Sequence, residues 1–128
     1  MLKIIAVDKK GDILTDVSLD RLKEQDIAWY WVDFDTPTRS DINLLTTFFK
    51  FHELLIEDCL TLLQRPKIEI SRQQIFLVSH VLKNIDDDYE TLNMFVGKNY
   101  IVTFHLSHIR YVNKIVPKIL QRGAEYSP

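Results

Sequence analysis

Apolar and aromatic residues recur along this chain with two different spacings, one typical of strands and one of helices. Short runs rich in β-branched, aromatic and other apolar residues predict strands at residues 2–7, 13–14, 28–34, 67–71, 74–82, 92–96 and 100–104. Gly11-Asp12 predicts a turn between the first two strands, and Gly97-Lys98-Asn99 predicts a hairpin connection between the last two. The unbroken apolar run at 75–78 predicts a strand covered on both faces.

Four helices are predicted from cap residues, from helical spacing of apolar residues and from the positions of proline. Ser18 can cap a short helix that reaches about Gln25, and Thr36 or Thr38 can cap a helix over 38–50. A further helix is predicted over 52–63, ended by Pro66. The last begins near Ser107 and is kinked or split by the internal Pro117.

The resulting order alternates strands and helices without a strict βαβ rhythm. The chain has 128 residues, 46% of them apolar, which is enough for one sizeable core. We therefore predict an α/β (α+β) fold with a mixed parallel and antiparallel sheet packed against helices. One domain is expected over 1–122, and residues 123–128 are expected to be an unstructured end.

Composition narrows the classes of function. The chain has 16 basic and 18 acidic residues, with a formal net charge of −2, so it lacks the basic footprint of a nucleic-acid-binding protein. Its single cysteine, Cys59, excludes an internal disulfide and fits a reducing, cytosolic compartment. No apolar run approaches the roughly 18 residues needed to span a bilayer. The predicted domain is therefore not expected to cross a membrane by itself.

The predicted helix over 52–63 separates into two faces when it is projected at about 100° per residue. Glu53 and Glu57 lie four residues apart on the polar face, and Asp58 lies at its edge. Carboxylates are the preferred ligands of hard cations such as Mg²⁺, so Glu57 and Asp58 form a candidate weak cation site. An ordinary solvated acidic face is the alternative. The apolar arc is expected to contain Leu55, Ile56, Cys59, Leu60, Leu62 and Leu63.

Two other groups of residues suggest chemistry but also have structural interpretations. Cys59 and His52, seven residues apart, could pair as thiolate and base, although a cysteine in an apolar arc is usually inert. His80 and His105 could ligate a metal, but neither has a second ligand at helix or hairpin spacing. We expect structural roles for these histidines and no catalytic site.

Basic residues occur in two further patterns. The segment Gln64–Glu69 could bind phosphate, but Pro66 and its basic neighbours also suit a turn that pairs with acidic residues. Basic residues recur every four positions near the end of the chain and could meet a neighbouring subunit or anionic lipid, or form a solvated face. They are Arg110, Lys114, Lys118 and Arg122.

Several of these segments together resemble the cytoplasmic domain of the CorA family of magnesium and cobalt transport proteins. The family carries H-P-L-x-x-E-D-x-L followed by Q-R-P-K-x-E, and the chain has the block 51–60 followed by Gln64–Glu69. The segments 31–38 and 97–105 also resemble family segments, in the same order, so the similarity covers roughly residues 28–106. Glu53 departs from the pattern, since the family usually has proline there.

The resemblance implies an αβα domain that forms the wall of a cytoplasmic funnel in a pentameric, membrane-embedded channel. It assigns Glu57 and Asp58 to half of an intersubunit, regulatory Mg²⁺ site, with the partner carboxylate on a neighbour's stalk helix. Glu53, which adds charge beside this pair, is a further candidate contributor. Metal binding in the isolated domain is then expected to be weak. The stalk, the two membrane helices and the Gly-Met-Asn motif are absent from this sequence.

Three functions of different classes remain open. The first is a Mg²⁺-sensing regulatory domain, at the cytoplasmic face of the membrane, of a transporter of magnesium and cobalt. The second is a stand-alone α/β protein-interaction module. The third, a small enzyme, has little support because no glycine-rich phosphate loop, ligand cluster or activated nucleophile is evident.

Overall fold

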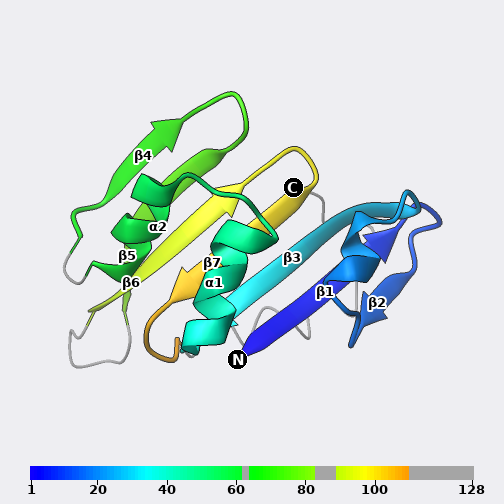
Figure 1. Cartoon of the computed structure of the whole chain (residues 1–128), viewed down its shortest axis with the longest axis horizontal. Coiled ribbons are helices and arrows are strands. Elements are labelled where there is room, and N and C mark those ends of the chain that lie inside the picture. The colour runs from blue at the N-terminus through cyan, green and yellow to red at the C-terminus, as the bar shows by residue number, and fades with distance from the viewer. Residues whose placement is uncertain (62–63, 83–88, 110–128) are drawn as a thin grey trace.

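The computed structural model describes residues 1–61, 64–82 and 89–109, which form one seven-stranded sheet and two α-helices (Figure 1). The strands are β1 (Leu2–Asp8), β2 (Ile13–Thr15), β3 (Ile27–Asp35), β4 (Lys67–Ile70), β5 (Ile75–Leu82), β6 (Tyr89–Val96) and β7 (Tyr100–His105). The helices are a short 3₁₀ segment η1 (Asp20–Lys23), α1 (Arg39–Thr47) and α2 (Glu53–Leu60). The predicted strands are all confirmed, whereas the helix predicted over 18–25 is only one 3₁₀ turn.

The strands lie in the order β2-β1-β3-β7-β6-β5-β4. Only β3 and β7 pair in parallel, and every other pairing in this sheet is antiparallel. The sheet is therefore mixed, as predicted, and the two predicted hairpins, β1–β2 and β6–β7, are both present. The parallel pair brings the carboxyl ends of β3 and β7 together, so that Asp35 lies opposite His105.

Both α-helices cover the same face of the sheet (Figure 1). Thr38 caps α1 in a capping box with Asp41, which selects Thr38 from the two predicted caps. Beneath the helices lies the larger core, which buries Leu45 of α1 and Cys59 of α2 against strand residues such as Phe34. The helix side of the sheet is therefore closed by a continuous apolar core.

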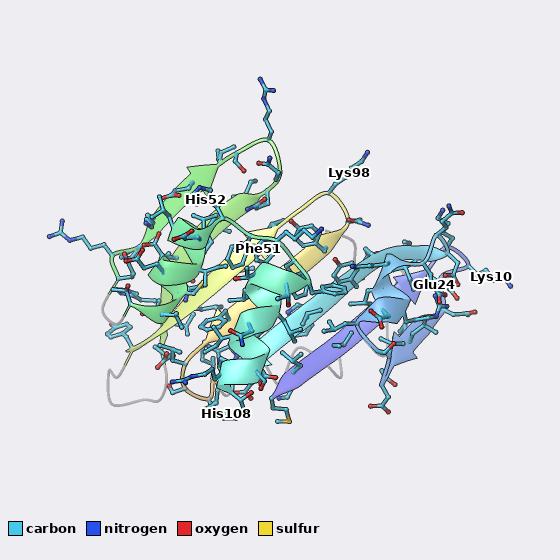
Figure 2. All side chains as sticks on the ribbon, viewed as in Figure 1. Lys10, Glu24, Phe51, His52, Lys98 and His108 are labelled. Carbon is cyan, nitrogen blue, oxygen red and sulfur yellow. The ribbon has the colours of Figure 1, made fainter. Side chains whose placement is uncertain are left out.

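The link between the two α-helices is longer than the sequence indicated, and it contributes a buried aromatic ring to the core. We predicted that the first helix would continue to residue 50, but α1 ends at Thr47. Lys50 has a positive φ of 56°, which turns the chain so that Phe51 enters the core. Phe51 is labelled in Figure 2. Its ring stacks on Phe95 of β6 with 3.9 Å between the ring centroids. Burying this aromatic ring stabilises the sharp turn in place of another helical turn.

The opposite face of the sheet has a second, smaller core of Ile5, Val7, Trp29, Trp31 and Ile109. Residues 107–109 are not helical, and the rest of the helix predicted from Ser107 lies outside the described residues, as do the basic residues from Arg110 onward. The loop predicted at 86–88 lies outside them too.

The prediction that β5 is covered on both faces was wrong. Phe76 and Val78 are buried, but Ile75 is 38% exposed and Leu77 is only partly buried. Burial alternates along β5 because one face of the strand packs on the helix-side core and the other face is less covered. The strand lies next to the edge strand β4.

Candidate functional site

Helix α2 carries the predicted cation site, and its first turn explains the departure from the family pattern. His52 is the N-cap, and its Nδ1 accepts a hydrogen bond from the Leu54 backbone N–H at 3.1 Å. Glu53 is therefore the first helical residue, a position where proline is favoured and where an acidic side chain also interacts well with the helix dipole. The helix start is compatible with either residue.

The apolar face of α2 is narrower than predicted. Cys59 is buried, and Leu55 and Ile56 pack at the edge of the core, but Leu60, which we assigned to this face, is 44% exposed. Leu60 is exposed because it is the last residue of α2, and the chain leaves the helix in an extended conformation at Thr61. Leu62 and Leu63 lie outside the described residues.

Asp58 uses both of its carboxylate oxygens within the domain. Its Oδ2 lies 2.6 Å from Nζ of Lys67, and its Oδ1 accepts a hydrogen bond from Nε2 of Gln64 at 3.1 Å. The side chain is 21% exposed. Charge-assisted hydrogen bonds of this length are among the stronger polar contacts in proteins. Asp58 is thus held against the turn that follows α2.

Lys67 joins that turn to the acidic helix and to its own strand. Its Nζ also lies 3.2 Å from Oε1 of Glu69, and the hydrogen bond to Asp58 raises the pKa of Lys67 above its ordinary value. For Lys67, these contacts confirm the prediction that the basic residues of Gln64–Glu69 pair with acidic neighbours. The Lys67 ammonium is therefore paired with the carboxylates of Asp58 and Glu69.

Glu57 and Glu53 are both exposed, in contrast to Asp58. Glu57 and Asp58 are adjacent in sequence, so their side chains leave the helix about 100° apart. Across the ranges that the structure describes, no group of three or more His, Cys, Asp or Glu side chains is arranged to hold a metal ion. The described part of the chain therefore offers carboxylates to a cation without surrounding it, and the metal site remains a prediction.

His80 and His105 both make structural contacts. His80 is exposed on β5, and its Nε2 lies 2.5 Å from the carbonyl oxygen of Gln64. His105 is fully buried, with Nε2 at 2.9 Å and 3.0 Å from the two carboxylate oxygens of Asp33, and Nδ1 at 2.7 Å from the carbonyl oxygen of Ser107. Both ring nitrogens of His105 face oxygen atoms that can accept hydrogen bonds, an arrangement that favours the doubly protonated ring.

The buried pair of Asp33 and His105 belongs to a network that the sequence analysis missed. Thr103 donates a hydrogen bond to Asp33 Oδ1 at 2.5 Å and accepts one from Nε1 of Trp31 at 2.9 Å. Burial lowers the pKa of His105, but the hydrogen bond and charge of Asp33 raise it, and the net shift is upward. The sequence did contain a signal for this network, because Asp33 lies between the apolar residues Val32 and Phe34 of a predicted core strand. A buried charge there requires a polar partner.

A neighbouring carboxylate, Asp35, marks the carboxyl end of β3. It accepts a hydrogen bond from Thr36 at 2.9 Å, lies 3.0 Å from Nδ1 of His108, and pairs with Lys3 at 3.5 Å. Burial raises the pKa of Asp35, while the hydrogen bonds from Thr36 and His108 lower it, and the net shift is downward. These contacts tie β1, β3 and the segment after β7 together.

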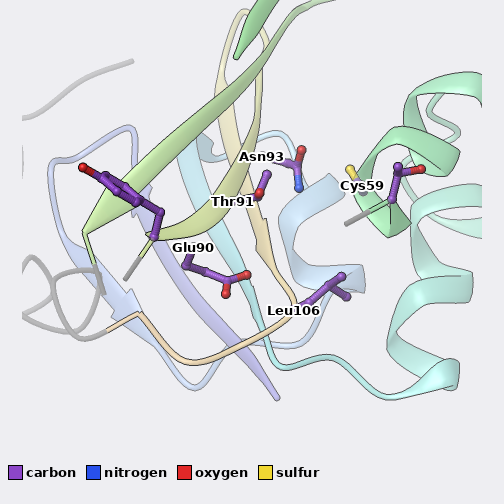
Figure 3. Close-up of a pocket in the computed structure, with 7 residues that line it drawn as sticks. Cys59, Glu90, Thr91, Asn93 and Leu106 are labelled. Atoms are coloured by element: carbon purple, nitrogen blue, oxygen red, sulfur yellow. The ribbon is translucent and has the colours of Figure 1, made fainter. Parts of the chain in front are cut away.

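A pocket of about 290 Å³ lies between the end of α2 and β6 (Figure 3). The amide oxygen of Asn93 is buried there with no hydrogen-bond partner in the described structure. Its lining is mixed: Cys59, Thr61, Tyr89, Glu90, Thr91, Asn93 and Leu106. Burial raises the pKa of the Cys59 thiol far above its ordinary value, so the thiol stays protonated.

The pairing of Cys59 with His52 is excluded by their places on α2. His52 caps the first turn, and Cys59 lies in the last turn, roughly 10 Å along the helix axis. His52 Nδ1 is also occupied by the Leu54 N–H. The thiol therefore has neither this base nor the low pKa that a nucleophile needs.

Similarity to known proteins identifies the protein family to which the chain belongs. Residues 26–128 match the family described as CorA-like Mg2+ transporter protein. The chain is also 36% identical over 129 residues to YfjQ of Bacillus subtilis (strain 168), whose name assigns it provisionally to metal ion transport. That match covers 96% of this chain and 40% of YfjQ. The chain belongs to the CorA-like transporter family, which is a transport family and not an enzymatic one.

Solved structures show the same fold at low sequence identity. The full-length CmaX protein superposes with a TM-score of 0.75 at 14% identity, covering 94% of this chain and 39% of CmaX. The soluble domain of CorA from Methanocaldococcus jannaschii gives a TM-score of 0.68 at 14% identity, covering 95% of this chain and 46% of that domain. These matches confirm the predicted α/β fold, and the chain spans less than half the length of each of these relatives.

In the described residues, no helix is long and apolar enough to cross a membrane.

Proposed function

We propose that residues 1–122 form the regulatory, Mg²⁺-sensing domain of a CorA-like transporter of magnesium and cobalt. In this proposal the domain forms part of a cytoplasmic funnel in a pentamer, and it meets the membrane only through helices that would follow it. Residues 123–128 would lead out of the domain. Membership of the family, together with the acidic pair Glu57 and Asp58 beside the Gln64–Glu69 turn, supports this function.

The observation that supports the proposal is that Glu57 and Asp58, neighbours in α2, both keep part of their side chains exposed. Glu57 is exposed and Asp58 is 21% exposed, so both are accessible from outside the domain. Carboxylate oxygens suit Mg²⁺, which keeps several of its waters and often takes only one or two carboxylates from a protein. Glu57 would supply an available ligand, whereas Asp58 would first have to exchange an existing partner.

The proposed mechanism is electrostatic. A Mg²⁺ ion between protomers would neutralise Glu57, Asp58 and an acidic residue of the neighbour, and would favour the closed state of the pore. Loss of the ion would leave like charges facing each other across the interface and would loosen the ring. Because Mg²⁺ binds one state better than the other, its concentration sets their ratio. Glu53, exposed in the first turn of α2, would add to the negative potential.

The direct experiment titrates Mg²⁺ into the full-length protein and follows protection from a protease. We expect protection to rise with Mg²⁺ in the wild type, and Glu57→Gln and Asp58→Asn each to raise the midpoint by roughly ten-fold, since ligand charge tunes affinity. If neither substitution changes the protection curve, the sensing role is wrong.

A second test concerns the gene. We expect the reading frame to continue past Pro128 into a long helix and two apolar spans separated by Gly-Met-Asn. A native protein that stopped near Pro128 would contradict the transporter function.

One observation favours the alternative of a stand-alone interaction module. Four apolar residues of α2 and the edge strand β4 are well exposed: Leu54 at 61%, Leu60 at 44%, Ile68 at 64% and Ile70 at 79%. Exposed apolar residues on an edge strand are typical of a surface that pairs with another chain. Capture of a soluble partner that stays bound in excess Mg²⁺, by a full-length protein without membrane spans, would support this alternative.

A further inference from the structure

We propose that Lys67 is a built-in competitor of the regulatory cation, so that a divalent ion binds Asp58 only after the lysine ammonium leaves. The inference rests on the proposed sensing role of Glu57 and Asp58. It adds a residue that sets the ion concentration at which the site responds.

The contacts of Asp58 carry the argument. The Lys67 Nζ lies 2.6 Å from Asp58 Oδ2, and Gln64 Nε2 donates to Oδ1 at 3.1 Å. A divalent cation that coordinated Asp58 would be brought close to this ammonium. Because the repulsion between two positive charges grows as their separation falls, lysine and metal ion cannot share the carboxylate without cost.

The backbone keeps Lys67 beside α2. Lys67 is the first residue of β4 and pairs with Val78 of β5, and Pro66 restricts the backbone immediately before it. The side chains of Lys67 and Asp58 are only 32% and 21% exposed, so solvent screens this pair less than it screens a fully exposed pair. The ammonium is thus present at the site at high local concentration.

A second acceptor lies within reach when Lys67 releases Asp58. Glu69 is two residues further along β4, on the same side of the strand, and its Oε1 already lies 3.2 Å from Lys67 Nζ. The displaced ammonium would keep this contact. The turn therefore allows two arrangements, one with Lys67 on both carboxylates and one with Lys67 on Glu69 and the metal ion on Glu57 and Asp58.

Lys98 provides a matched control because it has the same charge but projects from the β6–β7 turn, away from α2 (Figure 2). Mg²⁺-dependent protease protection of the full-length protein would be measured for wild type, Lys67→Gln, Lys67→Arg and Lys98→Gln. We expect Lys67→Gln to lower the midpoint about five-fold, the equivalent of one ion pair. Lys67→Arg, which keeps the positive charge, and Lys98→Gln should stay within two-fold of wild type, about the range of a weak surface effect.

Glu69→Gln tests the second arrangement without removing Lys67. Because the released lysine would lose its remaining acceptor, this variant should raise the midpoint about two-fold. Thermal unfolding of each variant would identify any variant that fails to fold. If Lys67→Gln fails to fold, Glu69→Gln and Lys67→Arg still test the inference.

The possible failures can be distinguished. A midpoint that is unchanged or higher in Lys67→Gln, while Glu57→Gln and Asp58→Asn still weaken the response, overturns the role of Lys67 and leaves the sensing function intact. If Lys67→Gln lowers the midpoint equally in the wild-type and Asp58→Asn backgrounds, Lys67 does not act through Asp58. If none of these variants changes the response, both the sensing function and the inference are wrong.

Discussion

Two acid–base pairs in this domain have similar distances and very different surroundings. His105 Nε2 lies 2.9 Å from Asp33 with both side chains almost fully buried, whereas Lys67 Nζ lies 2.6 Å from Asp58 with both side chains partly exposed. Strands β3 and β7 hold Asp33, Thr103 and His105 in place, and the carbonyl oxygen of Ser107, just after β7, contacts His105 Nδ1. The Lys67 pair instead lies beside a turn and has an alternative acceptor in Glu69. The first pair is suited to holding the fold, and the second to exchanging partners.

Removing His105 should have the largest effect on stability. The substitution His105→Ala leaves Asp33 as a buried charge without its cationic partner, so we expect a loss of about 3–5 kcal/mol in the free energy of unfolding. Urea denaturation followed by tryptophan fluorescence measures it. The exposed His80 provides the control, and His80→Ala should cost less than about 1 kcal/mol. Equal losses for the two variants would contradict the distinction between them.

The second-largest expected effect is a pH dependence of stability that arises from the buried pair of Asp33 and His105. Because the pKa of His105 is raised in the folded state, its contribution is fully present below the unfolded pKa, about 6.5, and is lost as pH rises through the folded pKa. Denaturation midpoints measured from pH 6 upward should therefore fall, and His105→Ala should flatten this fall. An equally steep fall in the variant would assign the titration to another group.

The partly exposed pair should matter little for stability. Asp58→Asn and Lys67→Gln are each expected to change the free energy of unfolding by less than about 1 kcal/mol, the usual value for a surface ion pair. The same variants should clearly shift the Mg²⁺ response. A loss comparable to that of His105→Ala would mean that the Asp58 pair is part of the structural framework and not an exchangeable contact.

The smallest change is expected from Glu53→Pro, which restores the residue usual in the family. Proline fits the first helical position of α2, so stability should stay within about 0.5 kcal/mol of wild type. The loss of one exposed carboxylate should raise the Mg²⁺ midpoint less than Glu57→Gln does. A larger effect at Glu53 than at Glu57 would move the centre of the acidic site toward the start of α2.

Much of the fold was predictable because its strands and turns have local signals. The alternation in 28–34 and the glycine-containing connection at 97–99 predicted strands that the structure contains. The early end of α1 was not predictable in the same way, because it depends on Phe51 stacking on Phe95, 44 residues further along the chain. Contacts of this kind override local helical spacing.

The candidate site was predicted in part. The acidic residues of α2 and the turn at Gln64–Glu69 were identified from the sequence, but their direct pairing through Asp58 and Lys67 was not. The pairing joins Asp58, near the end of α2, to Lys67, the first residue of β4, and so depends on where the helix ends and the strand begins. The network around Asp33 was missed for a related reason, since His105 is 72 residues away and becomes its neighbour only through the parallel pairing of β3 with β7.

The most direct test of the proposed sensing role compares Mg²⁺-dependent protease protection of the full-length wild type with the double variant Glu57→Gln/Asp58→Asn. A control with equal charge change, Asp16→Asn/Asp20→Asn, alters two exposed acids next to β2 and at η1. We predict that the double variant loses Mg²⁺-dependent protection while the control keeps the wild-type curve. Protection of the double variant at the wild-type midpoint would contradict the account.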